Sequence, residues 1–356
     1  LYGLKQAPRC WNTEFHEFLS SMGFRQSNAD PCVYLDERII IAIYVDDLVI
    51  LTHTDVEMIS IKRSLEEKFK MKDLGAINFF LGVSVEKLDD GILLHQKSYI
   101  EEILAKYCMQ GAKPVSTPRD MNVNLVKDDG SKAVDRSLYQ SMVGALLYLS
   151  MATRPDISQA VGVVSRFSAD PRETHLTAVK RIFCYLKGTI AMGLEYRCVE
   201  GCSLTCYSDA DWAGDLDTRH STSGYVFMFN GSVISWNSRL QRVTALSTAE
   251  AEYIALAESC KEVMWLKKLF NELNVKSPVR VMEDNQAAIA MVKNPVYHAR
   301  SKHIDIRFHY IRDLCKEGHI LIQYCPSSDN LADIMTKPVP RLQFERLRGK
   351  CDIVSQ

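Results

Sequence analysis

Residues 204–229 read LTCYSDADWAGDLDTRHSTSGYVFMF, and this stretch decides how we expect the second half of the chain to fold. Its apolar runs Leu204–Asp209 and Gly224–Phe229 have the length and composition of strands. Further strand-like and helical patterns follow, and together they predict a mixed α/β domain with helices flanking one sheet. They are a strand at Val233–Trp236, a helix at Ser247–Leu273, a strand at Val279–Asp284, a helix from Asn285, a helical stretch at 302–317, a strand at His319–Cys325 and a short helix from about Asp329.

Acidic side chains stand at the ends of the predicted strands. Asp209 closes the first strand and Asp284 closes the fourth. Ligands usually bind at the carboxyl ends of strands in an α/β sheet, although aspartate is also common wherever a strand stops. Ser247 and Glu250 fit a capping box at the start of the long helix. Glu252 has no such role, and it joins the two aspartates if the helix crosses the strand ends.

Asp333, in the first turn of the last predicted helix, is a fourth candidate carboxylate. It either stabilises the helix dipole or reaches the same sheet end. Four carboxylates in one pocket repel one another, and Mg²⁺ or Mn²⁺ relieves that repulsion. Two such ions about 3.5–4 Å apart form an arrangement that cleaves phosphodiesters. The basic stretch Lys293–Arg312 then becomes a candidate contact for a nucleic-acid backbone, with a solvated helix face as the alternative.

Five blocks of this half stand in a specific order: Cys206–Trp212 with Arg219–Tyr225, Ser247–Tyr253, Asp284–Ala288, Lys302–Arg307 and Asn330–Lys337. They resemble the ribonuclease H domain of copia-type LTR retrotransposon Pol. The resemblance implies cleavage of RNA in RNA–DNA hybrids at a D-E-D-D site, on Asp209, Glu252, Asp284 and Asp333. Asp333 is preferred to Asp305 because its context after the last strand matches the family's final helix. The nucleic-acid contacts expected are Arg219, Ser221, Thr222, Asn285, Arg300, Lys302, His303 and Arg307.

The first half of the chain carries two aspartates between strand-like runs. Ile39–Ile43 and Leu48–Leu51 flank Asp46 and Asp47 and predict a β-hairpin, in whose turn aspartates are ordinary. Tyr44–Asp47 nevertheless resembles the YxDD box of reverse transcriptases. The resemblance implies that Asp46 and Asp47 are polymerase metal ligands acting on a primer–template. Further blocks that resemble the copia-type polymerase lie at residues 1–9, 71–75, 80–82 and 153–157.

Family polymerases have a third metal-binding aspartate and a fingers region upstream of the LYGLKQAPR block with which this sequence begins. We therefore expect little or no polymerase activity from this chain without upstream Pol segments (fingers and first palm strand, beside integrase and protease). Other patterns predict a helix at Trp11–Met22, a hairpin from Phe79–Lys87 and Ile92–Gln96, and a helix break at Arg154–Asp156. The expected domains are a partial palm at 1–109, a connector at 110–135, thumb-like helices at 136–188, a ribonuclease H-like domain at 203–340 and a C-terminal tail at 341–356.

Composition excludes several protein classes. The chain is 47% apolar and 24% charged, which is typical of a globular protein and excludes a disordered chain, a collagen or a coiled coil. Its net charge is 43 − 44 = −1, which favours no particular class of partner. The chain has no apolar run of about 18 residues, so we expect no membrane-spanning helix. Eleven cysteines without a recognisable secretory signal predict reduced thiols inside the cell. Cys198, Cys202 and Cys206 are evenly spaced but lack the spacing of a zinc site.

The family resemblance also implies a place of action, namely cytoplasmic virus-like particles with later delivery of the DNA to the nucleus. Two alternatives stay open from the residues alone. A degenerate or co-opted fragment would bind nucleic acid through Lys293–Arg312 without catalysis. A small-molecule α/β enzyme would use aspartate and histidine, but the chain has neither a glycine-rich phosphate loop nor a nucleophile elbow.

Overall fold

A computed structural model describes residues 4–199, 201, 203–275, 278–293 and 305–355. The chain divides into two compact units, and each is described by itself. The smaller unit comprises Leu1–Ile77 with Met264–Lys276, and the larger comprises Asn78–Val263 with Ser277–Gln356. Among the described residues, no helix is long and apolar enough to cross a membrane.

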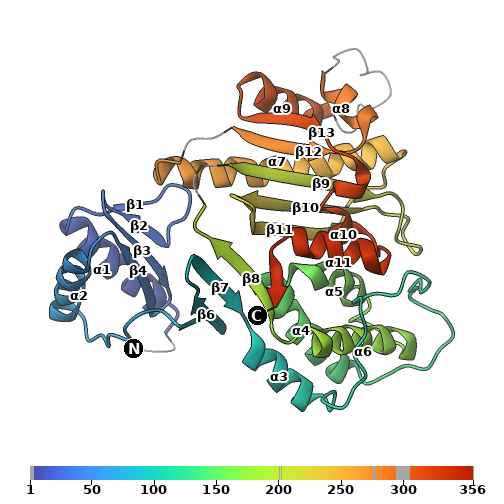
Figure 1. The fold of residues 1–356 in the computed structure, drawn as a ribbon, viewed down its shortest axis with the longest axis horizontal. Helices are drawn as coiled ribbons and strands as arrows, with labels where there is room; N and C mark the ends of the chain where they lie inside the picture. The colour runs from blue at the N-terminus through green and yellow to red at the C-terminus, as the bar shows by residue number, and fades with distance from the viewer. Residues whose placement is uncertain (1–3, 200, 202, 276–277, 294–304, 356) are drawn as a thin grey trace. The chain divides into compact units, whose positions relative to one another are not determined.

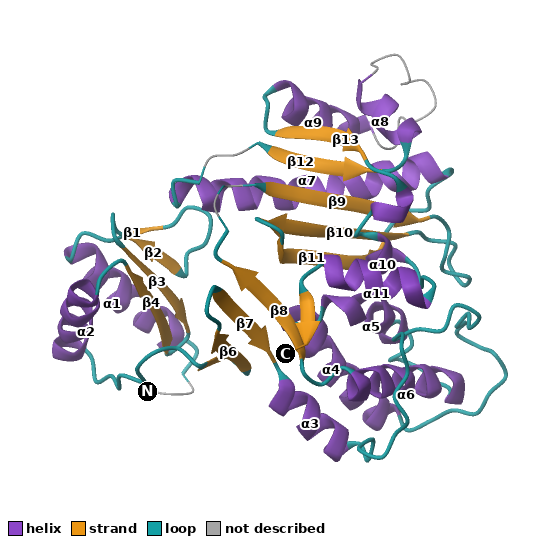
Figure 2. Ribbon diagram, in the orientation of Figure 1, coloured by secondary structure: helices purple, strands orange, loops and turns teal. Residues whose placement is uncertain are grey.

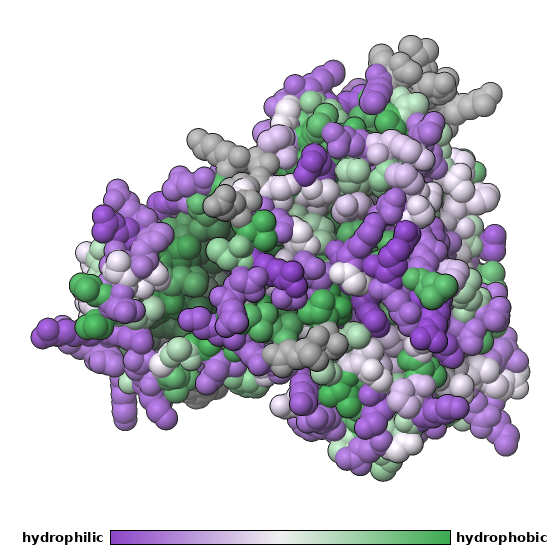
Figure 3. All heavy atoms as spheres, in the orientation of Figure 1, coloured by the Kyte–Doolittle hydropathy of each residue, from purple (hydrophilic) through white to green (hydrophobic). Residues whose placement is uncertain are grey.

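The smaller unit is an antiparallel sheet packed against two helices (Figure 1). Apolar side chains such as Phe15, Leu19, Ile41 and Leu65 form its core because they recur at helical or alternating strand spacing. Figure 3 shows further apolar side chains gathered over its strands. The elements are α1 (Ala7–Ser21), β1 (Arg25–Gln26), β2 (Val33–Leu35), β3 (Ile39–Tyr44), β4 (Asp47–Thr52) and α2 (Asp55–Lys68), with sheet order β1-β2-β3-β4.

The predicted hairpin at the two aspartates is confirmed. β3 and β4 pair from Ile39 opposite Thr52 to Tyr44 opposite Asp47, which leaves a two-residue turn. The first turn residue, Val45, has a positive φ of 55°, the backbone conformation that suits the twist of a tight hairpin. The Trp11 indole N–H donates to the Val45 carbonyl at 2.7 Å and so ties the turn to α1.

The main sheet of the larger unit has the order β11-β10-β9-β12-β13 (Figure 2). β9 is antiparallel to β10 but parallel to β12, so the sheet is mixed as expected for a ribonuclease H-like fold. Helix α7 packs on the sheet, where Ser235 donates to Glu262 at 2.7 Å and Gln241 donates to the Ala251 carbonyl at 2.9 Å. The elements are β9 (Leu204–Asp211), β10 (Thr222–Phe229), β11 (Ser232–Leu240), α7 (Thr248–Glu272), β12 (Val279–Glu283), α8 (Gln286–Lys293), α9 (Asp305–Lys316), β13 (Ile320–Tyr324), η4 (Ser327–Asp329) and α10 (Asp333–Thr336).

A second sheet of the larger unit, with order β14-β8-β7-β6-β5, joins segments far apart in the sequence. Leu94 on β7 pairs with Leu194 on β8, so residues 78–109 lie in the larger unit rather than with the strands before them. The second predicted hairpin is confirmed by the pairing of Lys87 with Ile92. The sheet consists of β5 (Phe79–Phe80), β6 (Val83–Lys87), β7 (Gly91–His95), β8 (Met192–Arg197) and β14 (Ile353–Ser355).

The expectation that residues 341–356 form only a C-terminal tail is wrong. Its residues form a helix and a strand, and Phe344, Leu347 and Cys351 are buried in the core of the larger unit. The pattern was missed because the helix is short and rich in charge, so its apolar face rests on a few residues. The helices around this core are α3 (Lys97–Lys106), α4 (Arg136–Ala152), η1 (Pro155–Ile157), α5 (Ser158–Ser165), α6 (Glu173–Gly188) and α11 (Arg341–Lys350).

The predicted helix break falls at a buried ion pair. Arg154 and Asp156 are 0% and 1% exposed, and two guanidinium nitrogens donate to the carboxylate at 2.9 and 2.7 Å. The Tyr185 hydroxyl donates to Asp156, while Arg154 also donates to the Thr189 carbonyl. A buried pair persists only when its remaining polar atoms are hydrogen-bonded, and this network satisfies that condition while it joins η1 to α6.

Candidate active site

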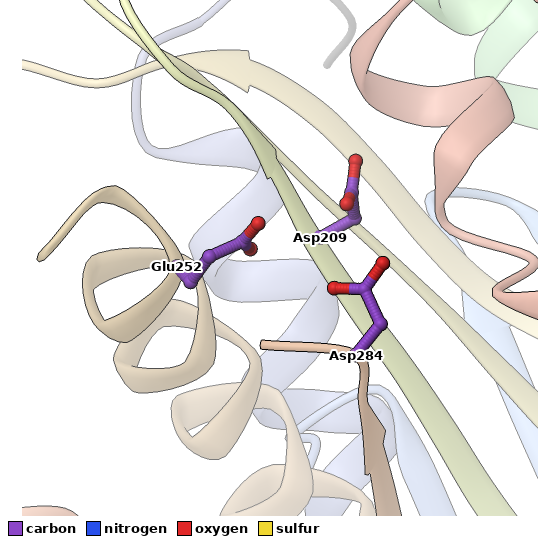
Figure 4. Close-up of side chains that lie close together, drawn as sticks. All are labelled: Asp209, Glu252 and Asp284. Atoms are coloured by element: carbon purple, nitrogen blue, oxygen red, sulfur yellow. The ribbon is translucent and has the colours of Figure 1, made fainter. Parts of the chain in front are cut away.

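Three of the predicted carboxylates converge at one end of the mixed sheet. Asp209 near the end of β9 and Asp284 directly after β12 share an edge because those strands are parallel and adjacent. Glu252 enters from the start of α7, and Figure 4 shows the three side chains pointing toward one another. One oxygen from each lies within 4.8 Å of the others. Residues far apart in the sequence therefore form a single acidic centre.

The amino-terminal turn of α7 positions Glu252. The Ser247 hydroxyl accepts from the Glu250 N–H at 3.2 Å, and the Glu250 carboxylate accepts from the Leu246 N–H at 2.9 Å. The predicted structural role of Glu250 at the helix start is thus confirmed. Glu252 lies beyond this cap and is 7% exposed.

Burial and repulsion between neighbouring carboxylates disfavour the charged forms of Asp209 and Glu252. Burial is the main cause that raises the pKa of Glu252 to about 11, and the neighbouring Asp209 raises it further. Burial likewise raises the pKa of Asp209 to about 6. One carboxylate oxygen of Glu252 is buried without a hydrogen-bond partner. An oxygen-only donor set with an unpartnered atom fits a hard divalent cation.

Asp333, the fourth predicted ligand, lies beside this group of three, on α10. Its oxygens bind the Lys337 ammonium at 2.8 Å and accept from the Gln343 amide at 3.1 Å. The same ammonium lies 3.6 Å from an oxygen of Asp209, so Lys337 bridges the two aspartates. Asp284 contributes to a raised pKa of Asp333, after the larger effect of burial. Asp333 therefore belongs to the same electrostatic cluster.

A close backbone approach brings α10 to the sheet. Gly224 pairs with Asp209, and a Cβ on this glycine would lie 2.6 Å from the Met335 Cβ and 2.7 Å from the Thr336 methyl. The Thr336 hydroxyl donates to Asp209. Asn330, fully buried, donates to the Ser208 carbonyl at 2.8 Å and so anchors the segment before the helix.

Glu283 is a buried carboxylate that the sequence analysis missed. It is 0% exposed, one of its oxygens accepts from the Asn285 N–H at 3.1 Å, and the other has no hydrogen-bond partner. Burial raises its pKa well above the usual range. Strand alternation could have revealed it, because Val279 and Val281 point inward and Glu283 continues that series.

Several predicted nucleic-acid contacts do not fit that role. Ser221 and Thr222 are 0% and 3% exposed; the Ser221 hydroxyl accepts from the Ala213 N–H, and Thr222 accepts from Arg166. The expectation that these two residues are surface contacts is wrong, because their side chains are buried and hold the loop between β9 and β10. Asn285 caps α8 by accepting from the Ala288 N–H at 3.0 Å. Arg219 is exposed.

The basic stretch Lys293–Arg312 is mostly outside the described residues. Arg300, Lys302 and His303 lie there, as does the side chain of Arg307. Arg312 is only 8% exposed and donates to the Met291 and Val292 carbonyls at the end of α8. The expectation that Arg312 faces phosphate is wrong, since it binds the carbonyls at the end of α8, which have no partner within the helix.

Asp46 and Asp47 are both exposed at the β3–β4 turn of the smaller unit. Among the described residues, no third carboxylate joins them in a cluster suited to a metal ion. Cys198 is exposed whereas Cys206 is buried, and Cys202 lies outside the described residues.

Comparison with known proteins places this geometry in context. A family model described as reverse transcriptase (RNA-dependent DNA polymerase) matches residues 1–121. The chain is 43% identical, over 97% of its length and 27% of the relative's, to the retrovirus-related Pol polyprotein from transposon TNT 1-94 of Nicotiana tabacum. It is 35% identical to a putative transposon Ty5-1 protein of Saccharomyces cerevisiae, over 74% of this chain and 87% of that one.

A similarity to a solved structure is limited to the fold. A foamy viral protease-reverse transcriptase in complex with an RNA/DNA hybrid has a TM-score of 0.55 at 14% identity, and the match covers 96% of this chain and 40% of that one. The chain spans about a quarter of the length of the Pol polyproteins that it matches.

Proposed function

This chain belongs to the family of retrovirus-related Pol polyproteins of copia-type transposons, and on that premise we propose that its larger unit hydrolyses the RNA strand of RNA–DNA hybrids. The observation that carries the proposal is the convergence of Asp209, Glu252 and Asp284, whose oxygens lie within 4.8 Å of one another. Asp333 completes the set of four. The residues fit Mg²⁺ or Mn²⁺, since they offer carboxylate oxygens only and one of those oxygens is buried without a partner.

The chain's own residues prepare the site for this reaction. Divalent ions held by the carboxylates would supply an activated water and stabilise the leaving oxygen of the phosphodiester. Asp209 lies beside Glu252 and Asp284 and also beside the Lys337–Asp333 pair, so it would hold a metal ion together with either group. Rigid strands and the capped start of α7 hold the carboxylates in place, which is the preorganisation that a metal site needs.

We propose a second role for the smaller unit within a longer protein. Its hairpin presents Asp46 in the exposed two-residue turn and Asp47 at the start of β4, and this hairpin lies within the match to the reverse transcriptase family. These aspartates would hold metal for nucleotide addition to a primer–template only when a further carboxylate is supplied by upstream Pol segments. The polymerase partners of the chain are therefore those segments and the primer–template itself.

The test is hybrid cleavage by the full chain. A labelled RNA–DNA hybrid is incubated with the protein in Mg²⁺, in Mn²⁺ and in EDTA, beside Asp284→Asn and the control Asp313→Asn, whose side chain is exposed on α9. We expect metal-dependent cleavage of the RNA strand alone, lost in Asp284→Asn and retained in the control. Cleavage that survives Asp284→Asn would contradict the proposed site. Salt-sensitive hybrid binding without cleavage in either metal would instead favour a non-catalytic binding module.

A further inference from the structure

The structure holds a positive charge of its own within the carboxylate cluster. The Lys337 ammonium lies 2.8 Å from an oxygen of Asp333 and 3.6 Å from an oxygen of Asp209. The lysine is the C-cap residue of α10, four residues after Asp333 at the start of that helix. Its side chain is 36% exposed, whereas those of Asp209 and Asp333 are 2% and 4% exposed. The ammonium therefore reaches inward from the rim of the site.

We propose that Lys337 is the resident counter-cation of this site, and that a divalent ion shared by Asp209 and Asp333 must displace its ammonium. The inference rests on the proposed function for the identity of the competing ion. According to this inference, the carboxylates on the two sides of Asp209 differ in how readily they bind a divalent ion. On one side, Glu252 has an unpartnered oxygen and is open to a cation. On the other side, Lys337 already neutralises Asp333.

The neighbouring contacts allow such an exchange without disrupting the site. The Thr336 hydroxyl donates to Asp209 and the Gln343 amide donates to Asp333, so both carboxylates stay oriented when the ammonium leaves. Lys337 is partly exposed on a flexible four-carbon stem, and its charge can therefore move into solvent rather than into the core. The expected behaviour is a tight divalent site at Glu252 and Asp284 and a weaker one at Asp333.

The two sites can be counted without any assay of activity. Binding of Mn²⁺ to the full chain is measured by titration calorimetry and by electron paramagnetic resonance of the free ion. Lys337→Met removes the charge with little change in side-chain length, Lys337→Arg keeps the charge, and Lys316→Met on α9 is the matched control for a surface lysine. We expect wild type to bind one ion tightly and a second weakly. In Lys337→Met the second Kd should fall about tenfold, equivalent to about 1.4 kcal/mol.

A second measurement protects the test against misfolding of the variant. The unfolding midpoint of Lys337→Met is compared with that of the double variant Asp333→Asn with Lys337→Met, in EDTA and in Mn²⁺. If Lys337 neutralises Asp333, the single variant is destabilised in EDTA, and either Mn²⁺ or the Asp333→Asn change restores it. If Lys337 had only a packing role, the Asp333→Asn change would not restore the stability of the single variant.

The outcomes separate this inference from the proposed function. Two Mn²⁺ sites whose affinities are the same in wild type, Lys337→Met and Lys337→Arg would overturn the role of Lys337 and leave the metal-dependent hydrolase intact. A second site that weakens in Lys337→Met would also overturn it, since the ammonium would then assist the ion. One Mn²⁺ site in wild type but two in Lys337→Met would support the displacement. No binding to either protein would overturn both proposals.

Discussion

Substitution of Glu252 by glutamine is expected to stabilise the metal-free protein while it abolishes metal-dependent activity. Burial and the neighbouring Asp209 raise the pKa of Glu252 from 4.5 to about 11, so the folded protein keeps this side chain neutral at pH 7. The unfolded chain ionises it, which favours unfolding. Between pH 4.5 and pH 7 lie 2.5 pH units at about 1.4 kcal/mol each. The penalty that glutamine removes is therefore at most about 3–4 kcal/mol.

The pH dependence follows from the same linkage. Because the pKa is raised in the folded state, the contribution of Glu252 to stability is complete below about pH 4.5 and declines steadily as the pH rises toward 11. In EDTA, urea unfolding of wild type should show falling stability from pH 5 to pH 8. The same curve for Glu252→Gln should be flatter and higher at pH 8.

The control for this prediction lies on the same helix. Glu258 forms an exposed pair with Lys261, and Glu258→Gln should change the free energy of unfolding by less than about 0.5 kcal/mol at either pH. Addition of Mg²⁺ should stabilise wild type and leave Glu252→Gln almost unaffected, because the variant lacks the carboxylate ligand. A Glu252→Gln protein that is less stable than wild type in EDTA at pH 8 would refute this reasoning.

Three further changes test the scaffold around the site. Gly224→Ala would place a methyl group 2.6 Å from the Met335 Cβ; we expect a loss of about 1–3 kcal/mol in urea unfolding together with reduced hybrid cleavage. Asp156→Asn leaves Arg154 buried without a countercharge and should destabilise the protein by about 3–5 kcal/mol, a result that a midpoint shift in the same assay would reveal or exclude. Val45→Gly relieves a positive φ of 55° and keeps the carbonyl that Trp11 binds, so it should raise the thermal unfolding temperature slightly; an unchanged or lower temperature would contradict this expectation.

Local patterns allowed much of the architecture to be predicted. Both hairpins, the break at Arg154–Asp156 and the strands of the mixed sheet follow from short-range alternation and turn residues, whose physical basis lies within a few neighbouring positions. The capping argument at Ser247 and Glu250 was also local, and it left Glu252 as the carboxylate free to enter the site. Local physics could not show that Ile353–Ser355 folds back as a strand beside β8 after the helix Arg341–Lys350.

The side chains that could carry the chemistry are recognisable in the sequence, because the carboxylates stand where strands end and helices begin. How these side chains meet depends on long-range packing. The parallel pairing of β9 and β12 brings Asp209 and Asp284 to one edge, and Gly224 lets α10 approach closely enough for Lys337 to bridge two aspartates. The same long-range packing buried Ser221, which looks like a surface contact in sequence. Burial and Coulomb interactions depend on distances in space, and those distances are set by contacts between distant segments of the chain.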